Sequence, residues 1–400
     1  FTMTPAARIQ AAIDCLDQIA TAARDGGAAA DTLIARYFST RRYAGSKDRR
    51  AVRELIYEVI RSIGTCPRSG RAAMIGYASA HAPDLLLEFG TDASHSPRAL
   101  DEDEDAADSS LAPEWLLSRL RARFGSSTPQ EVRALLERAP LDLRVNTLRT
   151  TRDAMLAEIE GVSACRYARD GLRTSGAMAV ESHPAFNDGL IEVQDEGSQL
   201  TALACVAQPG TTVLDLCAGA GGKTLALAAD MGNTGRLIAS DTDRGRLDRL
   251  ALRVARAGVT IAERRLLNPG KEAAALADLT GGVDLVLIDA PCSGTGTWRR
   301  NPEARWRLTP QRLDRLIAEQ RRLLDIGAAC VKSGGTLVYV VCSLLPDEGE
   351  AQIKRFLSLN EGWEPAPFSI ATDPKPVTSA VVTPHRHGCD GFFVARLTRL

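Results

Sequence analysis

Two cysteines, one lysine and one aspartate occupy positions where their side chains can act together. Asp289 and Cys292 follow one apolar run, Cys342 closes another, and Lys223 leaves a glycine-rich turn. Apolar runs of this length are typical of buried strands in a parallel sheet, whose carboxyl ends meet at one edge. A thiol near a lysine ammonium has a lowered pKa and attacks as a thiolate. We therefore predict that the four side chains converge on one site with a cysteine nucleophile.

The remaining cysteines lack this placement. Most buried cysteines behave as small apolar side chains, and we interpret the following seven in that way: Cys15, Cys66, Cys165, Cys205, Cys217, Cys330 and Cys389. The nine cysteines include no CxxC pair, which argues against a disulfide framework and against a structural zinc site. We expect free thiols in a reducing compartment and no bound metal.

The stretch 213–229, VLDLCAGAGGKTLALAA, has to position Lys223. Its first residues predict a buried strand, its glycines a tight turn, and TLALAA the first residues of a helix. Gly219, Gly221 and Gly222 lack a Cβ, so the backbone can approach a ligand and point amides at it from a helix N-terminus. This arrangement predicts a site for a nucleotide-like ligand.

Three kinds of loop share that arrangement. A phosphate loop, GxxxxGK[ST], needs a glycine where the chain has Cys217, and a dinucleotide loop needs GxGxxG where the chain has GxGG. The remaining interpretation is the S-adenosylmethionine loop of a Rossmann-like methyltransferase. Asp241 ends the next predicted strand, 236–240, where its carboxylate can accept both hydrogen bonds of a ribose diol. The alternative is that Asp241 caps a helix that begins near Arg244.

Two thiols in a methyltransferase indicate a carbon target. Carbon 5 of a pyrimidine is not nucleophilic, and the addition of a thiolate at carbon 6 makes it so. The proton on carbon 5 must then leave, and a second group can accept it as a general base. A methyltransferase that acts on an amino group needs neither thiol and typically carries an (N/D)PPY-like turn where this chain has DAPCS at 289–293.

The chain resembles the Sun/RsmB-type (Fmu) family of RNA cytosine-5 methyltransferases. The resemblance covers most of the chain and rests on motifs that stand in the family's order: VQDEGSQL (193–200), LDLCAGAGGKT (214–224), DLVLIDAPCSGTG (284–296), RRNPEARWRL (299–308), VYVVCSLLPDEGE (338–350) and HRHGCDGFF (385–393). It implies that Cys342 is the nucleophile and that Cys292 releases the product. It further implies that Asp289 hydrogen-bonds the base near N3 and that Lys223 assists.

The resemblance also implies a set of residues that bind S-adenosylmethionine. These are Cys217, Ala218, Gly219, Ala220, Gly221, Gly222, Lys223, Asp241 and Asp289, with Asn268 as our choice for the adenine side. The chain departs from the family pattern at three places. Ala220 stands where a proline is usual, Val341 replaces the threonine of TCS, and the adenine-side aspartate has no clear counterpart. None of these departures removes a reacting group.

A basic segment lies near the N-terminus. Between Arg36 and Arg71 ten Arg or Lys residues stand against three acids. This surplus is either a solvated helix face or a surface that contacts phosphates. The segment 45–61 resembles the NusB-like helical domain of the ribosomal members of the family, which favours RNA, and ribosomal RNA over transfer RNA, as the partner. An unpaired cytosine is the easier substrate because its base must leave any stack.

The chain divides into four parts by pattern. We expect a helical NusB-like domain at 1–98, an exposed acidic linker at 99–112, a small α+β subdomain at 113–188 and a Rossmann-like class I methyltransferase domain at 189–400. The fold class is therefore α/β with an all-α N-terminal domain. In the subdomain, the predicted strand 141–149 carries Arg144 and Asn146, which face either solvent or RNA.

Composition is that of an ordinary globular protein, with 44% hydrophobic and 25% charged residues. The sequence contains no apolar run of membrane-spanning length and no signal pattern, so we expect a cytoplasmic monomer with no membrane partner. Phe1 and Thr2, ahead of Met3, are expected to be foreign to the natural chain.

The predicted function is methylation of carbon 5 of cytosine in ribosomal, 16S-type, RNA. The alternatives are a transfer RNA substrate, an exocyclic amine or protein side chain as target, and a non-catalytic RNA-binding assembly factor.

Overall fold

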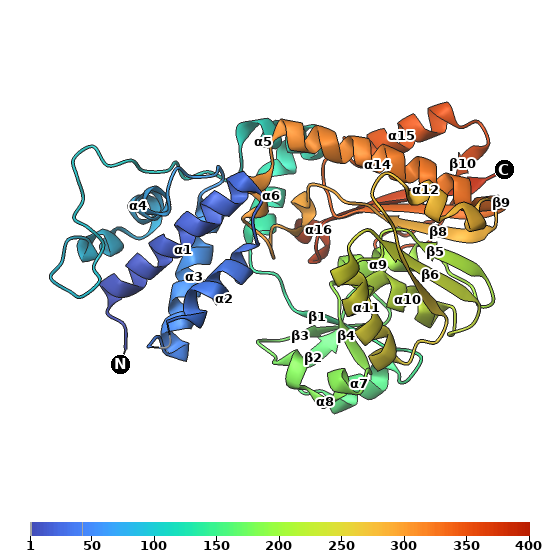
Figure 1. Cartoon of the computed structure of the whole chain (residues 1–400), viewed down its shortest axis with the longest axis horizontal. Helices are drawn as coiled ribbons and strands as arrows, with labels where there is room; N and C mark the ends of the chain where they lie inside the picture. Colours follow the sequence, from blue (N-terminus) through green and yellow to red (C-terminus); the bar gives the residue numbers. More distant parts are fainter. Residues whose placement is uncertain (1, 42) are drawn as a thin grey trace. The chain divides into compact units, whose positions relative to one another are not determined.

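Helices build the N-terminal part of the protein. This computed structural model describes residues 2–41 and 43–400. Four helices form the first bundle (Figure 1), namely α1 (Pro5–Asp25), α2 (Ala30–Ser39), α3 (Ser46–Ser62) and α4 (Gly70–His81). The side chain of Thr4 caps α1 by accepting a hydrogen bond from the Ala7 amide, and Pro5 occupies the first helical position, where no amide is needed. Ile9, Ile13 and further apolar residues at helical spacing fill the core of the bundle, as their spacing predicted.

The contacts of the chain define two compact units. The helical unit consists of residues 1–137 and 297–310, and the sheet unit consists of 138–296 and 311–400. This grouping differs from the expected ranges, which placed a linker at 99–112. Part of the acidic stretch is held on the helical unit, because Glu104 pairs with Arg71 at 2.8 Å and the Ala107 amide donates to the Ala72 carbonyl at 2.9 Å. Two helices, α5 (Glu114–Phe124) and α6 (Thr128–Leu136), complete this part of the unit.

Residues 297–310 belong to the helical unit although they follow a strand of the sheet unit in sequence. Their short helix α13 (Ala304–Arg307) carries Arg305 and Trp306, both buried. The Trp306 indole donates to the Ile63 carbonyl at 2.6 Å, and the Arg305 guanidinium donates to the Ile60 carbonyl at 2.6 Å. These bonds occupy carbonyls at the C-terminal end of α3, which a helix leaves without internal partners. The segment is therefore part of the core that holds α3 in place.

A small antiparallel sheet opens the sheet unit. Its strand order is β2-β3-β1-β4, with β1 (Asp142–Val145), β2 (Val162–Ala164), β3 (Gly171–Thr174) and β4 (Ile191–Val193). The short helices α7 (Arg152–Glu158) and α8 (Pro184–Asn187) accompany it. The predicted strand at 141–149 is confirmed by β1, but both expected orientations of Arg144 and Asn146 are wrong. Both side chains are buried, since Arg144 donates to Gln194 at 2.7 Å and Asn146 donates to two backbone carbonyls.

The large sheet has the order β10-β12-β9-β8-β5-β6-β7, and β11 pairs with β12. Its strands are β5 (Thr212–Asp215), β6 (Arg236–Asp241), β7 (Ala262–Leu266), β8 (Val283–Asp289), β9 (Val331–Val341), β10 (Trp363–Pro365), β11 (Ser379–Val382) and β12 (Phe392–Arg399). The strands from β9 to β7 are parallel, and β12 runs antiparallel to β9. The strand order reverses at β5, because β6 lies on one side of it and β8 on the other. Ligands of such sheets bind at the carboxyl ends of the strands at this switch point.

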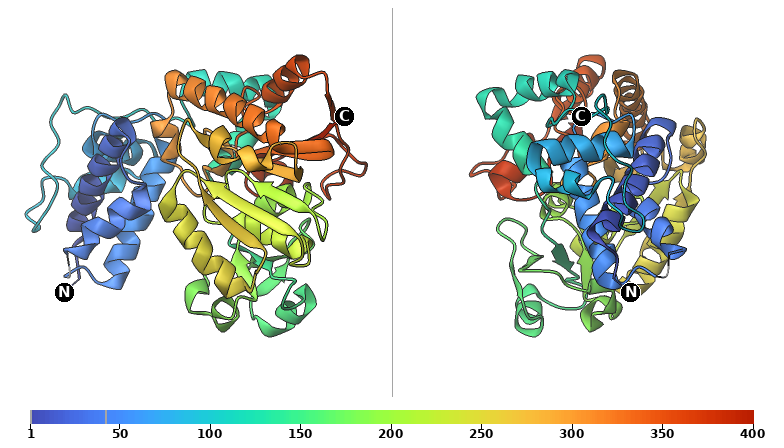
Figure 2. Two further views of the ribbon diagram at one scale, coloured as in Figure 1. Left: turned by 45° about the vertical axis from the view of Figure 1, so that its right-hand side comes forward. Right: turned by 90° about the vertical axis from the view of Figure 1, so that its left-hand side faces the viewer.

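Helices cover both faces of this sheet (Figures 1 and 2). One layer contains α9 (Glu196–Leu203), α10 (Gly222–Asp230) and α11 (Arg244–Ala257), and the other contains α12 (Glu272–Ala275), α14 (Pro310–Cys330) and α15 (Glu350–Leu359). The apolar run of β8 serves both layers, since Leu287 packs into the first core and Val286 into the second. The prediction of a doubly wound, Rossmann-like sheet is confirmed.

The strand β9 contains two glycines. The helix α14 ends at Cys330, and Gly334 and Gly335 lie inside β9. Gly334 has a φ of +72°, which lets residues of β9 leave the ladder where its register with β8 shifts. The helix α16 (Pro384–His387) precedes the last strand. Among the described residues, no helix combines the length and the apolar character needed to cross a bilayer.

Candidate active site

The glycine-rich turn lies between β5 and α10, as predicted. Gly219 and Gly221 have φ values of +55° and +88°, a region that side chains with a Cβ rarely adopt. Gly221 is the N-cap of α10, and a Cβ there would come within 2.8 Å of Leu250. At Gly219 and Gly222 an added Cβ would lie 3.9 Å from the side chains of Arg246 and Gln194, which is ordinary van der Waals contact. The turn is thus tightly packed at Gly221 and less tightly packed at Gly219 and Gly222.

Asp241 ends β6 beside this turn. Its carboxylate accepts the Gly219 amide and the Asp243 amide, each at 2.8 Å. The N-cap of α11 is Asp243, whose side chain accepts the Arg246 amide, so the alternative of Asp241 as the helix cap is wrong. Each carboxylate oxygen of Asp241 can accept a further hydrogen bond. Asn268 lies on an exposed segment after β7, next to Leu267, whose amide donates to the Asp241 carbonyl at 2.9 Å.

The residues of this edge fit a bound adenosine cofactor. At Gly219 and Gly222 a Cβ would take up room beside the N-terminus of α10 that the glycines leave to a ligand. The Asp241 carboxylate is held rigidly by two amides and keeps acceptor capacity for a diol. The acceptor capacity of Asp241 therefore matches a ribose diol.

Lys223 and Asp289 form an ion pair at the same edge. The Lys223 ammonium donates to the Asp289 carboxylate at 2.7 Å, and it lies 5.1 Å from the centre of the Phe392 ring. Burial lowers the pKa of Lys223, but the attraction of Asp289 outweighs burial and the pKa lies above its ordinary value. Lys223 is therefore a fixed cation, although its side chain is only 7% exposed.

Cys292 and Cys342 face each other. Their Sγ atoms are 3.3 Å apart, with Cys292 in the turn after β8 and Cys342 directly after β9. Both residues are half-buried by surface exposure. The structure thus brings together the two cysteines that the sequence singled out, and it pairs the lysine with the aspartate.

The prediction of a lowered thiol pKa is wrong for Cys292. The hydrogen bond with Cys342, together with burial and the nearby charge of Cys342, raises the pKa of Cys292 well above its ordinary value. The thiol of Cys292 is therefore harder to deprotonate than an ordinary cysteine thiol. Burial similarly raises the pKa of Cys217, which supports our interpretation of that cysteine as an unreactive side chain.

Asp215, below the glycine-rich turn, is fully buried. One carboxylate oxygen accepts a hydrogen bond from Thr224 at 2.7 Å, and the other has no partner among the described residues. Burial is the main cause that raises the pKa of Asp215 from 3.8 to about 7. Because the folded pKa lies above the unfolded one, the stabilisation is complete below pH 3.8 and is lost as the pH rises through about 7.

We therefore predict that Asp215→Asn removes this pH dependence. The free energy of unfolding of the variant, relative to the parent, is expected to rise by up to about 4 kcal/mol between pH 4 and pH 8. Urea unfolding at several pH values, followed by a probe in the sheet unit, measures this difference. A difference that stays constant across the pH range would show that Asp215 has an ordinary pKa.

A polar network behind the cysteines was not among the predicted site residues. Ser293 and Ser343, the residues after the two cysteines, both donate to the buried Glu348. Gln320 of α14 joins the same network. A carboxylate in the stretch LLPDEGE looks like a surface residue in sequence, so only its burial identifies it.

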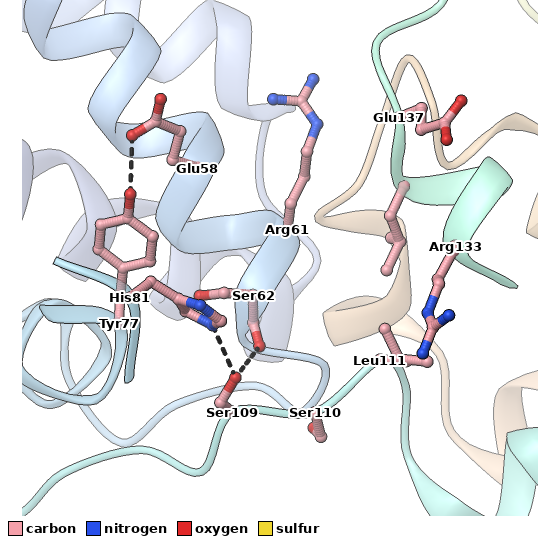
Figure 3. Close-up of a pocket in the computed structure, with 11 residues that line it drawn as sticks. Glu58, Arg61, Ser62, Tyr77, His81, Ser109, Ser110, Leu111, Arg133 and Glu137 are labelled. Atoms are coloured by element: carbon pink, nitrogen blue, oxygen red, sulfur yellow. Dashed lines mark hydrogen bonds between the residues drawn. The ribbon is translucent and has the colours of Figure 1, made fainter. Parts of the chain in front are cut away.

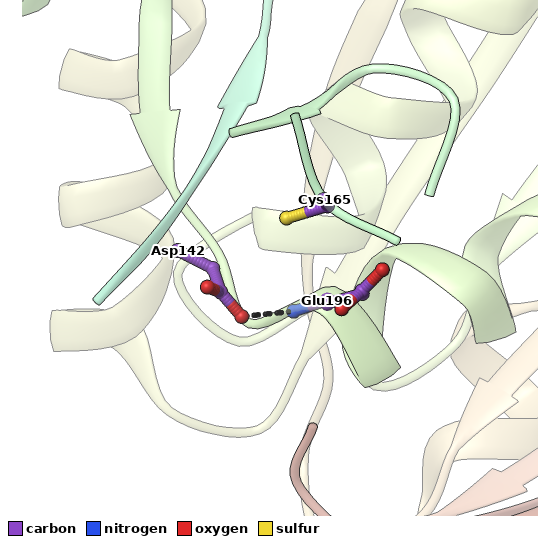
Figure 4. Close-up of side chains that lie close together, drawn as sticks. All are labelled: Asp142, Cys165 and Glu196. Atoms are coloured by element: carbon purple, nitrogen blue, oxygen red, sulfur yellow. Dashed lines mark hydrogen bonds between the residues drawn. The ribbon is translucent and has the colours of Figure 1, made fainter. Parts of the chain in front are cut away.

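The side chains of Asp142 on β1, Cys165 just after β2 and Glu196 on α9 gather at one point (Figure 4). A carboxylate oxygen of Asp142, the Sγ atom of Cys165 and a carboxylate oxygen of Glu196 lie within 4.8 Å of one another. Arg173 pairs with Asp142 at 2.7 Å and with Glu196 at 3.2 Å. Burial and the two carboxylates raise the pKa of Cys165, which keeps its thiol protonated. We interpret the cluster as a buried ion-pair network that fastens β1 and β3 to α9.

The helical unit contains a cavity of 630 Å³ (Figure 3). Its rim carries Arg61 and Arg133, but also Glu58 and Glu137, so its charges offset one another. The Tyr77 hydroxyl donates to Glu58 at 2.8 Å. Because the two arginines and the two glutamates offset each other, the cavity offers no net positive charge to an anionic ligand.

Comparison with known proteins identifies relatives for a large part of the chain. The sequence pattern of the family described as 16S rRNA methyltransferase RsmB/F matches residues 202–398. The pattern of a ferredoxin-like domain of RsmF/B-like methyltransferases matches residues 112–181. A Synechocystis protein named "Probable ribosomal RNA small subunit methyltransferase B" is 40% identical over 303 residues, which cover 72% of this chain and 66% of that protein. A ribosomal RNA small subunit methyltransferase B of Enterobacter is 33% identical, with 72% and 67% covered. The matched region thus spans about two thirds of the length of these relatives.

Solved structures show the same fold. The crystal structure of PH0851 matches with a TM-score of 0.76 and 25% identity and covers 100% of both chains. A methyltransferase homologue from Pyrococcus horikoshii matches with a TM-score of 0.62 and 27% identity, covering 72% of this chain and 95% of that one.

Proposed function

Because the chain belongs to the RsmB/F family of 16S rRNA methyltransferases, we propose that it transfers a methyl group from S-adenosylmethionine to carbon 5 of a cytosine in small-subunit ribosomal RNA. The observation that carries this proposal is the pair of sulfur atoms of Cys292 and Cys342, 3.3 Å apart at the carboxyl ends of β8 and β9. Methylation of an amine needs no thiol, whereas activation of carbon 5 needs a nucleophile and a base.

The first step forms a covalent bond to the base. The Cys342 thiolate donates an electron pair to carbon 6 of cytosine, and the electrons of the C5–C6 double bond move toward carbon 5 and N3. Asp289 faces the N3 side of the base in this proposal, and the fixed ammonium of Lys223, 2.7 Å from Asp289, offsets the negative charge that accumulates there. The activated carbon 5 would then take the methyl group that bound S-adenosylmethionine supplies, and the bond between the methyl carbon and the sulfonium sulfur would break with its electron pair left on sulfur.

The second step frees the product. Cys292 takes the proton from carbon 5, the double bond forms again, and the bond between carbon 6 and Cys342 breaks with the electron pair returning to sulfur. At rest the pKa of Cys292 is raised mainly by the hydrogen bond to Cys342. Once Cys342 is bonded to carbon, that hydrogen bond and the charge of Cys342 are gone. The largest cause that raises the pKa of Cys292 is then removed, and we propose that its thiol gives its proton to solvent and acts as the base.

S-adenosylmethionine supplies an electrophilic methyl group on a sulfonium when it is bound. We propose that Gly219, Gly221 and Gly222 provide the backbone against which it lies and that Asp241 accepts the ribose hydroxyls. The remaining members of the proposed set are Cys217, Ala218, Ala220, Lys223, Asp289 and, on the adenine side, Asn268. The absence of a Cβ at these glycines and the carboxylate held by two amides support this assignment.

RNA is the proposed partner of the helical unit. The first half of α3 exposes Lys47, Arg49, Arg50 and Arg53 within seven residues. The acid among them, Asp48, is buried and pairs with Arg8 at 2.8 Å. Glu54 and Asp31 pair with Arg50 at 3.6 Å and with Arg53 at 2.8 Å, so they offset part of the exposed charge. Arg42, which belongs to the same basic segment in sequence, lies outside the described residues. A cationic helix face of this kind favours contact with phosphates.

Release of tritium from RNA tests the proposed target atom. The protein is incubated with S-adenosylmethionine and with small-subunit ribosomal RNA that carries tritium at carbon 5 of cytosine. We expect one tritium to enter the solvent for each methyl group transferred, because the proton of carbon 5 must leave. Methyl transfer without tritium release would place the methyl group elsewhere, and transfer RNA as the better substrate would favour the alternative partner. Cofactor binding without any methyl transfer would favour a non-catalytic assembly factor.

A further inference from the structure

The two cysteine positions are joined by a single buried carboxylate. Ser293 follows Cys292, and Ser343 follows Cys342. The hydroxyl groups of both serines donate to the same oxygen of Glu348, Oε2, at 2.5 Å each. The turn after β8 and the end of β9 are therefore tied to one atom.

The other oxygen of Glu348 holds the backbone of the turn. The Ser293 amide donates to Oε1 at 2.8 Å, and the Gln320 side chain donates to the same oxygen at 2.9 Å. Gln320 also donates to the Pro291 carbonyl at 2.9 Å. Cys292 lies between Pro291 and Ser293, so its backbone is fixed on both sides.

Burial makes this arrangement rigid. Glu348 is fully buried, and a buried carboxylate is stable only when hydrogen-bond donors surround it. Its four donors come from the turn, from the end of β9 and from α14. Further bonds connect the same two segments, since the Gly296 amide donates to the Cys342 carbonyl at 3.0 Å and the Leu344 amide donates to Thr295 at 2.8 Å.

We propose that Glu348 is the positioning residue that fixes the separation and orientation of the two thiols. The catalytic role of Glu348 depends on the proposed function. Its effect on the positions of the two thiols does not depend on that function. Among the described residues, Glu348 makes no hydrogen bond to either cysteine side chain. It acts on their positions through Ser293 and Ser343, while its charge adds to the raised pKa of Cys292. A displacement of reacting groups by about 1 Å costs on the order of 100-fold in rate, so loss of this tie should affect turnover strongly.

Two variants separate geometry from charge. Glu348→Ala removes the acceptor for all four donors. In Glu348→Gln the carbonyl oxygen still accepts from the Ser293 amide and from Gln320, while the new amide can donate to the two serine hydroxyls, which also act as acceptors. We therefore expect Glu348→Gln to keep the positions of both cysteines and Glu348→Ala to lose them.

The first readout needs no RNA. Diamide, a two-electron oxidant, removes one hydrogen from each thiol, forms the disulfide between Cys292 and Cys342 and is itself reduced to the hydrazine. The rate is followed by mass spectrometry of the linked peptides. We expect this rate to fall at least about 10-fold in Glu348→Ala and to stay within about 3-fold of the parent in Glu348→Gln. The second readout is methyl transfer, for which kcat should fall about 100-fold in Glu348→Ala with little change in the KM for S-adenosylmethionine.

Tyr339→Phe is the matched control. The Tyr339 hydroxyl donates to the backbone carbonyl of Glu348 at 2.8 Å, so this variant loses a buried hydrogen bond to the same residue without changing its carboxylate. It should leave the disulfide rate unchanged. A parent-like disulfide rate in a folded Glu348→Ala, or an equal loss in Glu348→Gln, would overturn the proposal. If the disulfide rates follow the expectation while no RNA is methylated by the parent protein, the proposed function fails and the positioning role stands.

Discussion

Cys342→Ala is expected to lower kcat/KM for RNA methylation by at least about 10,000-fold, because covalent addition to carbon 6 has no substitute in this site. The variant should still bind S-adenosylmethionine, since the glycine-rich turn and Asp241 lie on β5 and β6. Radioactive methyl transfer to ribosomal RNA measures the activity, and calorimetry measures cofactor binding.

Cys330→Ala is the control for this experiment. Cys330 is a buried thiol at the end of α14 and contributes only to the apolar core. Its variant should lose some stability and retain activity. If Cys342→Ala keeps a substantial part of the activity, the covalent mechanism is wrong, and an exocyclic amine or a protein side chain becomes the better target.

Trp306→Ala is expected to destabilise the helical unit by about 3–5 kcal/mol. The indole is buried in the core formed by α1 to α4 and donates to the Ile63 carbonyl at 2.6 Å. Its removal leaves a cavity and an unpaired carbonyl near the end of α3. Hydrogen exchange of peptides from α3 and α4 measures the effect locally, so that the sheet unit provides an internal reference.

Trp115→Ala provides the comparison. Trp115 lies on α5 in the same unit and is only half-buried, so its truncation should cost less. Equal protection of α3 in the parent and in Trp306→Ala would show that residues 297–310 are not part of the core of the helical unit.

The reacting residues of the site could be predicted from the sequence because their positions follow from the topology of the sheet. Lys223, Asp289, Cys292 and Cys342 each stand at the end of a strongly apolar or glycine-rich segment. In a parallel sheet such segments bring their ends to one edge. The structure pairs the lysine with the aspartate and the two cysteines with each other. Their catalytic roles remain predictions.

Other features could not be read from the sequence because they depend on distant contacts. The segment 297–310 follows a sheet strand, and nothing in its composition shows that Arg305 and Trp306 complete the core around α3. Arg144 has the polarity of a surface residue, and only the position of Gln194 explains its burial. The lowered thiol pKa expected near Lys223 failed for Cys292 because the second thiol, at 3.3 Å, has the larger influence.

The most direct test of the two-thiol mechanism is a denaturing gel of Cys292→Ala after incubation with small-subunit ribosomal RNA and S-adenosylmethionine. Without the thiol that removes the carbon 5 proton, the methylated base should stay bonded to Cys342 and the RNA should migrate with the protein. The double variant Cys292→Ala with Cys342→Ala should carry no RNA. If Cys292→Ala releases its RNA on denaturation while it still transfers methyl groups, the account of two cooperating cysteines is contradicted.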